Sequence, residues 1–66
     1  MVLNVSASGM VETVDVVSFS GKTVKTYTFG GQMVFGISLQ DLPKEKLVFV
    51  FHSASGNATV DVDLTQ

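Results

Sequence analysis

Residues 33–40, MVFGISLQ, alternate apolar side chains with small or polar ones without interruption. In an extended strand the first set would share one face, and its members are Met33, Phe35, Ile37 and Leu39. A helix would instead need apolar side chains every three or four residues. The stretch therefore predicts a β-strand with one face in a core, which makes the fold class all-β.

The same period of two continues outward from this stretch. Residues 58–64, ATVDVDL, alternate in the same way, whereas residues 46–51, KLVFVF, are apolar on both faces. A strand that is apolar on both faces is typical of a central strand that is covered on both sides. Val48 and Val50 then need cover from other strands, a neighbouring domain or a second copy of the chain. The expected core consists of Phe35, Ile37, Leu39, Leu47, Phe49, Val60 and Val62.

The patterns predict six strands in a single domain, residues 1–66. They are expected near residues 2–7, 10–19, 22–29, 33–40, 46–53 and 58–65. Their regular spacing is typical of a small Ig-like or fibronectin-like antiparallel β-sandwich of about six to seven strands, and the alternative is a small closed barrel. Near Val16 and Val17 the inward set of side chains changes, which predicts a β-bulge.

Three similar segments separate the expected strands: SASG at residues 6–9, SFSG at 18–21 and SASG at 53–56. Glycine adopts positive φ without steric cost, and serine bonds nearby backbone groups. We therefore expect turns here, with Gly9, Gly21 and Gly56 in connections and at least two of them at positive φ. The GGQ segment at residues 30–32 predicts another turn.

The segment QDLPKEK at residues 40–46 differs from these turns. Pro43 lacks a backbone N–H and so marks a crossover between strands. Leu42 is expected to cap the edge of the core.

Composition limits the function classes. The chain has 66 residues, 45% hydrophobic, with a formal net charge of −2 and no cysteine. It therefore lacks the basic surface of a nucleic-acid-binding protein and forms no disulfide. No apolar run approaches the ~20 residues of a membrane span, and no signal-peptide pattern begins the chain.

The candidate catalytic residues are the single histidine, His52, and the neighbouring Ser53 and Ser55. With an aspartate they could be drawn as a Ser-His-Asp triad. The G-x-S-x-G pattern of a nucleophile elbow is absent from the sequence, and so small a domain leaves little room for a substrate cleft. We expect a polar strand end here, no catalytic residue and no enzyme.

A calcium site is the candidate metal centre. Asp61 and Asp63 would point the same way on one strand, and Glu12, Asp15 or Asp41 could add oxygen ligands. The simpler interpretation is that these aspartates occupy the wet face of a strand, where they discourage edge-to-edge pairing. We adopt the simpler interpretation and expect no metal or cofactor-binding residue.

Three stretches resemble the C-terminal sorting domains of the type IX secretion system of Bacteroidetes. They are VDVVSFSGKTVKTYTF (14–29), ISLQDLPKEKLVFVF (37–51) and SGNATVDVDL (55–64). The residues that match are Gly21 and Lys22 in the first turn, Ile37, Leu39, Leu42 and Pro43 in the middle segment, and Gly56 in the last turn. The family's glycine and aromatic residue after the proline are replaced here by Glu45, Lys46 and Leu47.

This resemblance implies an Ig-like module that is read by the secretion machinery. We therefore expect a non-catalytic module of a larger secreted or cell-surface protein. The alternative is an accessory module that binds carbohydrate or a protein partner, although one Tyr and no Trp argue against a strong sugar-binding surface. Exposed strands also predict self-association into a homodimer.

Overall fold

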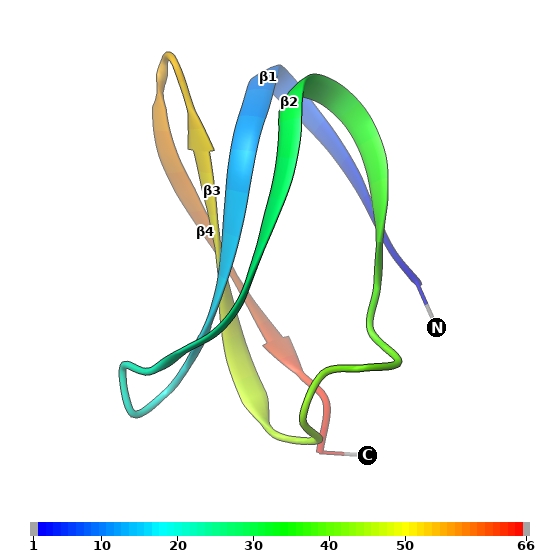
Figure 1. Ribbon diagram of the computed structural model, residues 1–66, viewed down its shortest axis with the longest axis vertical. Coiled ribbons are helices and arrows are strands. Elements are labelled where there is room, and N and C mark those ends of the chain that lie inside the picture. Colours follow the sequence, from blue (N-terminus) through cyan, green and yellow to red (C-terminus); the bar gives the residue numbers. More distant parts are fainter. Residues whose placement is uncertain (1, 66) are drawn as a thin grey trace.

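The computed structural model describes residues 2–65, which form an all-β structure (Figure 1). Its strands are β1 (Val2–Ser18), β2 (Thr23–Ser38), β3 (Lys46–Ser53) and β4 (Gly56–Asp63). They make one open antiparallel sheet in the order β2-β1-β3-β4. The all-β class is confirmed, but four strands replace the expected six to seven, and the alternative closed barrel is not formed. In residues 2–65 no helix is long and apolar enough to cross a membrane.

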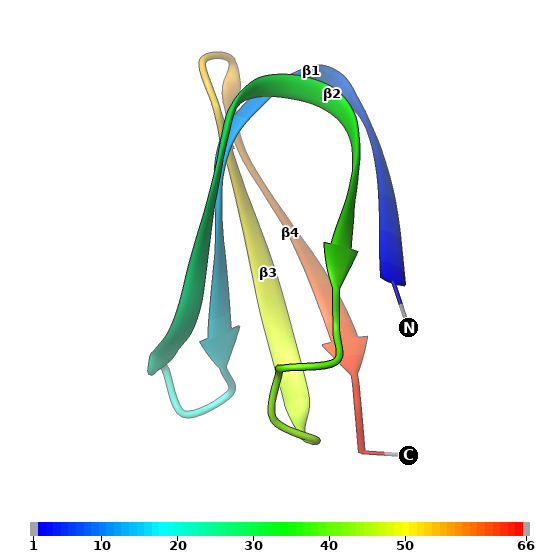
Figure 2. The same cartoon turned by 45° about the vertical axis from the view of Figure 1, so that its right-hand side comes forward.

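The difference in strand number arises because two expected pairs of strands are continuous. The strands expected near 2–7 and 10–19 merge into β1, which ends at Ser18, and those expected near 22–29 and 33–40 merge into β2, which spans Thr23–Ser38. Midway, both strands bend together into an arch that places the first half of β1 and the second half of β2 over the sheet (Figure 2). The register shifts at this bend, between Ser6 and Val11 and again between Val11 and Thr13.

Paired glycines accompany the bend in β2. Gly30 and Gly31 have φ values of +65° and +93°, and glycine is the residue that reaches this region without steric cost. The expected turn at residues 30–32 is therefore wrong, because β2 continues through the bend and pairs with β1 on both sides of the two glycines, at Thr28 and at Gln32.

Two of the three S-x-S-G segments form the expected turns. Gly21 (φ +92°) and Gly56 (φ +134°) lie at the β1–β2 and β3–β4 connections. In the first turn the Ser18 backbone N–H donates to the Lys22 carbonyl at 2.8 Å, and the Gly21 N–H donates to the Ser18 carbonyl at 2.9 Å. Gly9 is different, because it lies inside β1 without positive φ. The turn expected at residues 6–9 is wrong.

The irregularity expected near Val16 and Val17 is present as a register shift in the pairing of β1 with β2. The change of inward face lies elsewhere. Val11 and Val14 are both buried, so the alternation changes between them and not at Val16, which stays buried. The shift of face therefore coincides with the arch.

The core lies between the sheet and the arch. Six of the seven expected core residues follow the prediction closely or in part, and four of them, Ile37, Leu39, Leu47 and Phe49, are buried while Phe35 is half-buried. Val62 is also half-buried, but Val60 is 46% exposed and is a wrong assignment. Val60 points to the inner face, as its alternation predicts, but the arch does not extend over it.

The expected central position of KLVFVF is confirmed, because β3 lies between β1 and β4. Leu47, Phe49 and Phe51 face the core, while Val48 and Val50 on the opposite face are half-buried. In the connection to β3, Leu42 is buried as expected and Pro43 is exposed.

Candidate functional site

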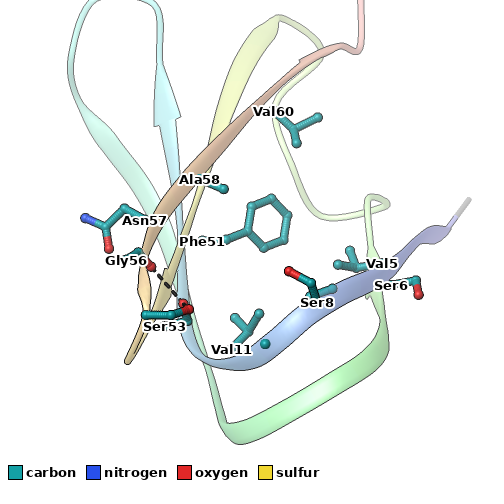
Figure 3. Close-up of a pocket in the computed structure, with 13 residues that line it drawn as sticks. Val5, Ser6, Ser8, Val11, Phe51, Ser53, Gly56, Asn57, Ala58 and Val60 are labelled. Carbon is teal, nitrogen blue, oxygen red and sulfur yellow. Dashed lines mark hydrogen bonds between the residues drawn. The ribbon is translucent and has the colours of Figure 1, made fainter.

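A groove of about 390 Å³ opens between the first half of β1 and the edge strand β4 (Figure 3). Its lining residues come from three strands and the β3–β4 turn. They are Val5, Ser6, Ala7, Ser8, Gly9, Val11, Phe51, Ser53, Ser55, Gly56, Asn57, Ala58 and Val60. Every one of these side chains is uncharged, so the groove offers apolar contacts and neutral hydrogen-bonding groups.

The two SASG segments meet at this groove. Residues 6–9 line one wall and Ser53, Ser55 and Gly56 line the other. A Cβ atom placed on Gly9 would lie 3.3 Å from the Ser55 Oγ, which shows how closely the walls approach. The sequence pattern led us to predict a turn at each segment, and the contact between the two segments was missed. The only signal for it was the exact repetition of the same small residues, SASG.

The floor of the groove is apolar. Phe51 lies at its base with 9% of its surface exposed, and Val60 on β4 remains 46% exposed beside it (Figure 3). An apolar side chain laid over Val60 would be removed from water, which contributes roughly 25 cal/mol for each Å² of apolar surface buried. The groove therefore favours an apolar ligand group.

Two strand edges border the groove. Among the described residues, β4 pairs with β3 alone, and residues 2–6 of β1 pair with β2 alone. Each strand consequently turns one side of its backbone away from the sheet. Such edges present N–H and C=O groups to which another extended chain can pair.

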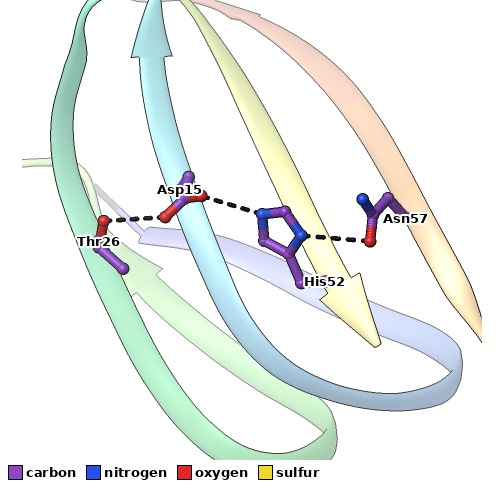
Figure 4. Close-up of polar contacts among 4 residues, drawn as sticks. All are labelled: Asp15, Thr26, His52 and Asn57. Atoms are coloured by element: carbon purple, nitrogen blue, oxygen red, sulfur yellow. Dashed lines mark hydrogen bonds and ion pairs between the residues drawn. The ribbon is translucent and has the colours of Figure 1, made fainter. Parts of the chain in front are cut away.

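A chain of polar contacts crosses the opposite face of the sheet (Figure 4). The Thr26 hydroxyl donates to Asp15 Oδ1 at 2.8 Å, the Asp15 Oδ2 lies 2.9 Å from His52 Nε2, and His52 Nδ1 lies 3.2 Å from Asn57 Oδ1. These four residues come from four different strands. The hydrogen bond from Thr26, followed by that from His52, lowers the pKa of Asp15 below its ordinary value of 3.8. The contacts tie the four strands together at one level.

The structure does not assemble the Ser-His-Asp arrangement. Both ring nitrogens of His52 are engaged, one by Asp15 and one by Asn57. The Ser53 hydroxyl donates to the Gly56 carbonyl at 2.8 Å and lies 3.1 Å from the Ser55 Oγ. A serine nucleophile would need a hydrogen bond to a histidine nitrogen, and both nitrogens of His52 are instead used in a polar bridge with Asp15 and Asn57.

The candidate calcium ligands lie apart. Asp61 and Asp63 are exposed on β4, Asp15 contacts His52, and Asp41 lies in the β2–β3 connection. Within residues 2–65 no group of three acidic, histidine or cysteine side chains is placed to hold a metal ion. The Asp63 carboxylate instead accepts bonds from the Thr65 hydroxyl and backbone N–H, which lower its pKa.

The aromatic side chains form a stack along the inner face. Ring centroids lie 6.3 Å apart for Tyr27 and Phe29, 4.0 Å for Phe29 and Phe35, and 6.5 Å for Phe35 and Phe51. These rings pack against the core. Phe19 is 62% exposed but lies apart from them, in the β1–β2 turn. Sugar-binding surfaces need rings that are exposed in a row, which this stack does not offer.

Comparisons with protein-family models, curated proteins and solved structures found no match to this chain.

Proposed function

We propose that the chain is a non-catalytic module that binds another polypeptide, as an accessory part of a larger secreted or cell-surface protein. The observation that carries the proposal is the groove between two unpaired strand edges, β4 and residues 2–6 of β1. Strand addition to an exposed edge is a common mode of peptide recognition, in which the backbone gives affinity and the side chains give specificity.

A protein ligand is better supported than a carbohydrate ligand. The aromatic residues Tyr27, Phe29 and Phe35 stack on one another and on the core, so their faces are not available as a flat platform. The groove itself offers one largely buried ring, Phe51, among aliphatic and serine side chains. These features favour a backbone with small apolar side chains.

The sorting role is a particular form of this proposal, in which the partner is the secretion machinery. A homodimer formed through exposed strands is another form. For the fold, we propose a small Ig-like or fibronectin-like sandwich. The arched half of the β1–β2 hairpin lies over the sheet, and this arrangement supports the proposal.

Binding selectivity tests the proposed function. We would immobilise the chain and screen it in parallel against a random peptide library displayed on phage and against a glycan array. Enrichment of peptide ligands is expected. Binding to glycans with no enriched peptide would contradict the proposal and favour the carbohydrate alternative.

The sorting role has its own test. The chain would be fused to the C-terminus of a fluorescent reporter in a Bacteroidetes host that has a type IX system. Export of the fusion, and not of the reporter alone, is expected for a sorting domain. Equal retention of both proteins in the cell would argue against that role and leave peptide binding to be judged separately.

A further inference from the structure

We infer that the groove binds an extended peptide segment that pairs with the free edge of β4, is apolar where it crosses Val60, and is basic where it passes Asp61. The inference rests on the proposed function and specifies its site and its class of ligand. It is drawn from three independent features of the described residues: backbone pairing, burial and charge.

The backbone feature is the one-sided pairing of β4. Residues Gly56–Asp63 pair with β3 along their whole length, so the other side of the strand faces the groove or solvent. Facing walls built from Ser8, Gly9 and Ser55 have small side chains. At Gly9 the walls meet, because the Ser55 Oγ would lie 3.3 Å from a Cβ there, and beyond this narrow end the groove runs along β4 toward Val60. The groove therefore suits a polypeptide backbone in extended form.

The exposed apolar side chains of β4 determine where the ligand should be apolar. Successive residues of β4 point to opposite faces, which places Ala58 and Val60 over the groove and Thr59 and Asp61 on the other face. Residues that lie directly opposite one another in an antiparallel pair contact on the same face. Apolar ligand residues opposite Ala58 and Val60 would cover the 46% of Val60 that is now exposed.

The charges near the groove determine which ligand residues are expected next to the apolar ones. All lining residues are uncharged, and a charge buried among them would lose its hydration without a partner. Beyond the lining, β4 continues with the exposed carboxylates of Asp61 and Asp63. Lys46 lies opposite Asp63 on β3 and offsets its charge, whereas Asp61 lies opposite Val48. A Lys or Arg of the ligand is therefore expected beside Asp61.

The same charges disfavour a second copy of the chain as the occupant. A copy that added its own β4 would bring another Asp61 and Asp63 to this edge, and each copy has a net charge of −2. Like charges that lie close together in paired strands are destabilising. A neutral and basic strand is the complementary ligand.

The test uses a synthetic peptide of the same length as β4, Lys-Val-Lys-Val-Thr-Val-Thr-Val, capped at both ends. In antiparallel register its lysines lie opposite Asp61 and Asp63, and its valines lie opposite Gly56, Ala58, Val60 and Val62. Binding would be measured by fluorescence anisotropy of the labelled peptide, with amide hydrogen exchange to locate it. Saturable binding with slowed exchange in β4 is expected, while exchange in β2, the other edge strand, stays unchanged.

Protein variants make the test specific. Val60→Lys places a charge in the groove at a position that is already half-exposed, and we expect it to weaken binding by about tenfold or more. The matched control is Val34→Lys, since Val34 is 72% exposed on β2 and does not line the groove. Far-UV circular dichroism would confirm that both variants are folded. Equal weakening by both variants would overturn the inference.

Peptide variants separate the contributions. Replacing both lysines by glutamate should weaken binding, and this effect should disappear in Asp61→Asn/Asp63→Asn. N-methylation of alternate residues, made in both phases, should abolish binding in the phase that faces β4. If N-methylation in neither phase weakened binding, strand pairing would be overturned.

A dimer that Val60→Lys dissociates, with no peptide binding, would overturn the ligand class in favour of a second copy. A library peptide that binds Val60→Lys as tightly as the parent chain would overturn this site and leave the proposed function intact.

Discussion

Phe29 and Phe35 belong to the same strand, yet their rings stack with centroids 4.0 Å apart. In a straight strand, six residues span about 20 Å. The stack is therefore a direct result of the arch in β2, and it joins the part of β2 in the sheet to the part that lies over it. The ring contact spans Gly30 and Gly31, whose positive φ values accompany the bend.

Removing one ring of this stack should loosen the arch. Phe35→Ala is expected to reduce the free energy of unfolding by about 2–3 kcal/mol, less than for a fully buried phenylalanine because Phe35 is half-buried. Urea denaturation would measure the loss. Val34→Ala is the control, since Val34 is 72% exposed and should change stability by no more than about 0.5 kcal/mol.

The centre of the core should be more sensitive. Phe49 is fully buried on β3, and Phe49→Ala should cost about 3–5 kcal/mol, a large share of the 5–15 kcal/mol that stabilises a typical domain. Thermal melting would detect it. Phe19→Ala removes the same ring from an exposed turn and should have little effect. Similar melting temperatures for the two variants would contradict the assigned core.

The positive φ of Gly30 at the bend can be tested by comparing L-alanine and D-alanine at this position. A Cβ atom on Gly30 would meet nothing within 4 Å, so the cost of a side chain there comes from its φ of +65°. We expect Gly30→Ala to destabilise the fold by about 1 kcal/mol. D-alanine at the same position, introduced by chemical synthesis, accepts positive φ and should be at least as stable as glycine. Equal loss with both enantiomers would show that the bend does not need this conformation.

The polar bridge predicts a pH dependence with a definite sign. The pKa of Asp15 is lowered in the folded chain, chiefly by the Thr26 hydrogen bond. The folded state therefore binds fewer protons than the unfolded state, and stability rises with pH. This contribution is present above the ordinary value of 3.8 and is lost as pH falls through the lower folded pKa.

Two substitutions check this dependence. Asp15→Asn should reduce the loss of stability on acidification, and Thr26→Val should reduce it in part because the main cause of the shift is removed. The measurement is the free energy of unfolding as a function of pH. Asp63, whose pKa is also lowered, accounts for a slope that remains in both variants. An unchanged slope in Asp15→Asn would show that the bridge does not stabilise the carboxylate.

In β3, β4 and the second half of β2, alternation predicted which side of the strand faces inward, but it could not predict how far the cover extends. Ile37 and Leu39 are buried as expected, whereas Val60 has the same alternation and stays exposed at the groove. Burial of Val60 depends on where the arch ends, and that is a property of the tertiary structure.

Glycine patterns were ambiguous for a related reason. Gly21 and Gly30 both have positive φ, yet Gly21 ends a strand and Gly30 lies within one. Positive φ is required by a turn and by a sharp bend alike, so the local sequence could not distinguish six short strands from four strands of which two are bent. The groove was missed with the bend, because the bend brings the two SASG segments together.

The strand order β2-β1-β3-β4 has a consequence for folding kinetics. The β1–β2 and β3–β4 pairs are hairpins closed by short turns, whereas the β1–β3 pair joins Ser18 to Leu47 and Val11 to Ser53. Contacts between residues far apart in sequence form late, because closing the intervening loop costs entropy before they stabilise the chain. Each hairpin is therefore expected to form early, and the docking of β1 on β3 is expected to limit the folding rate.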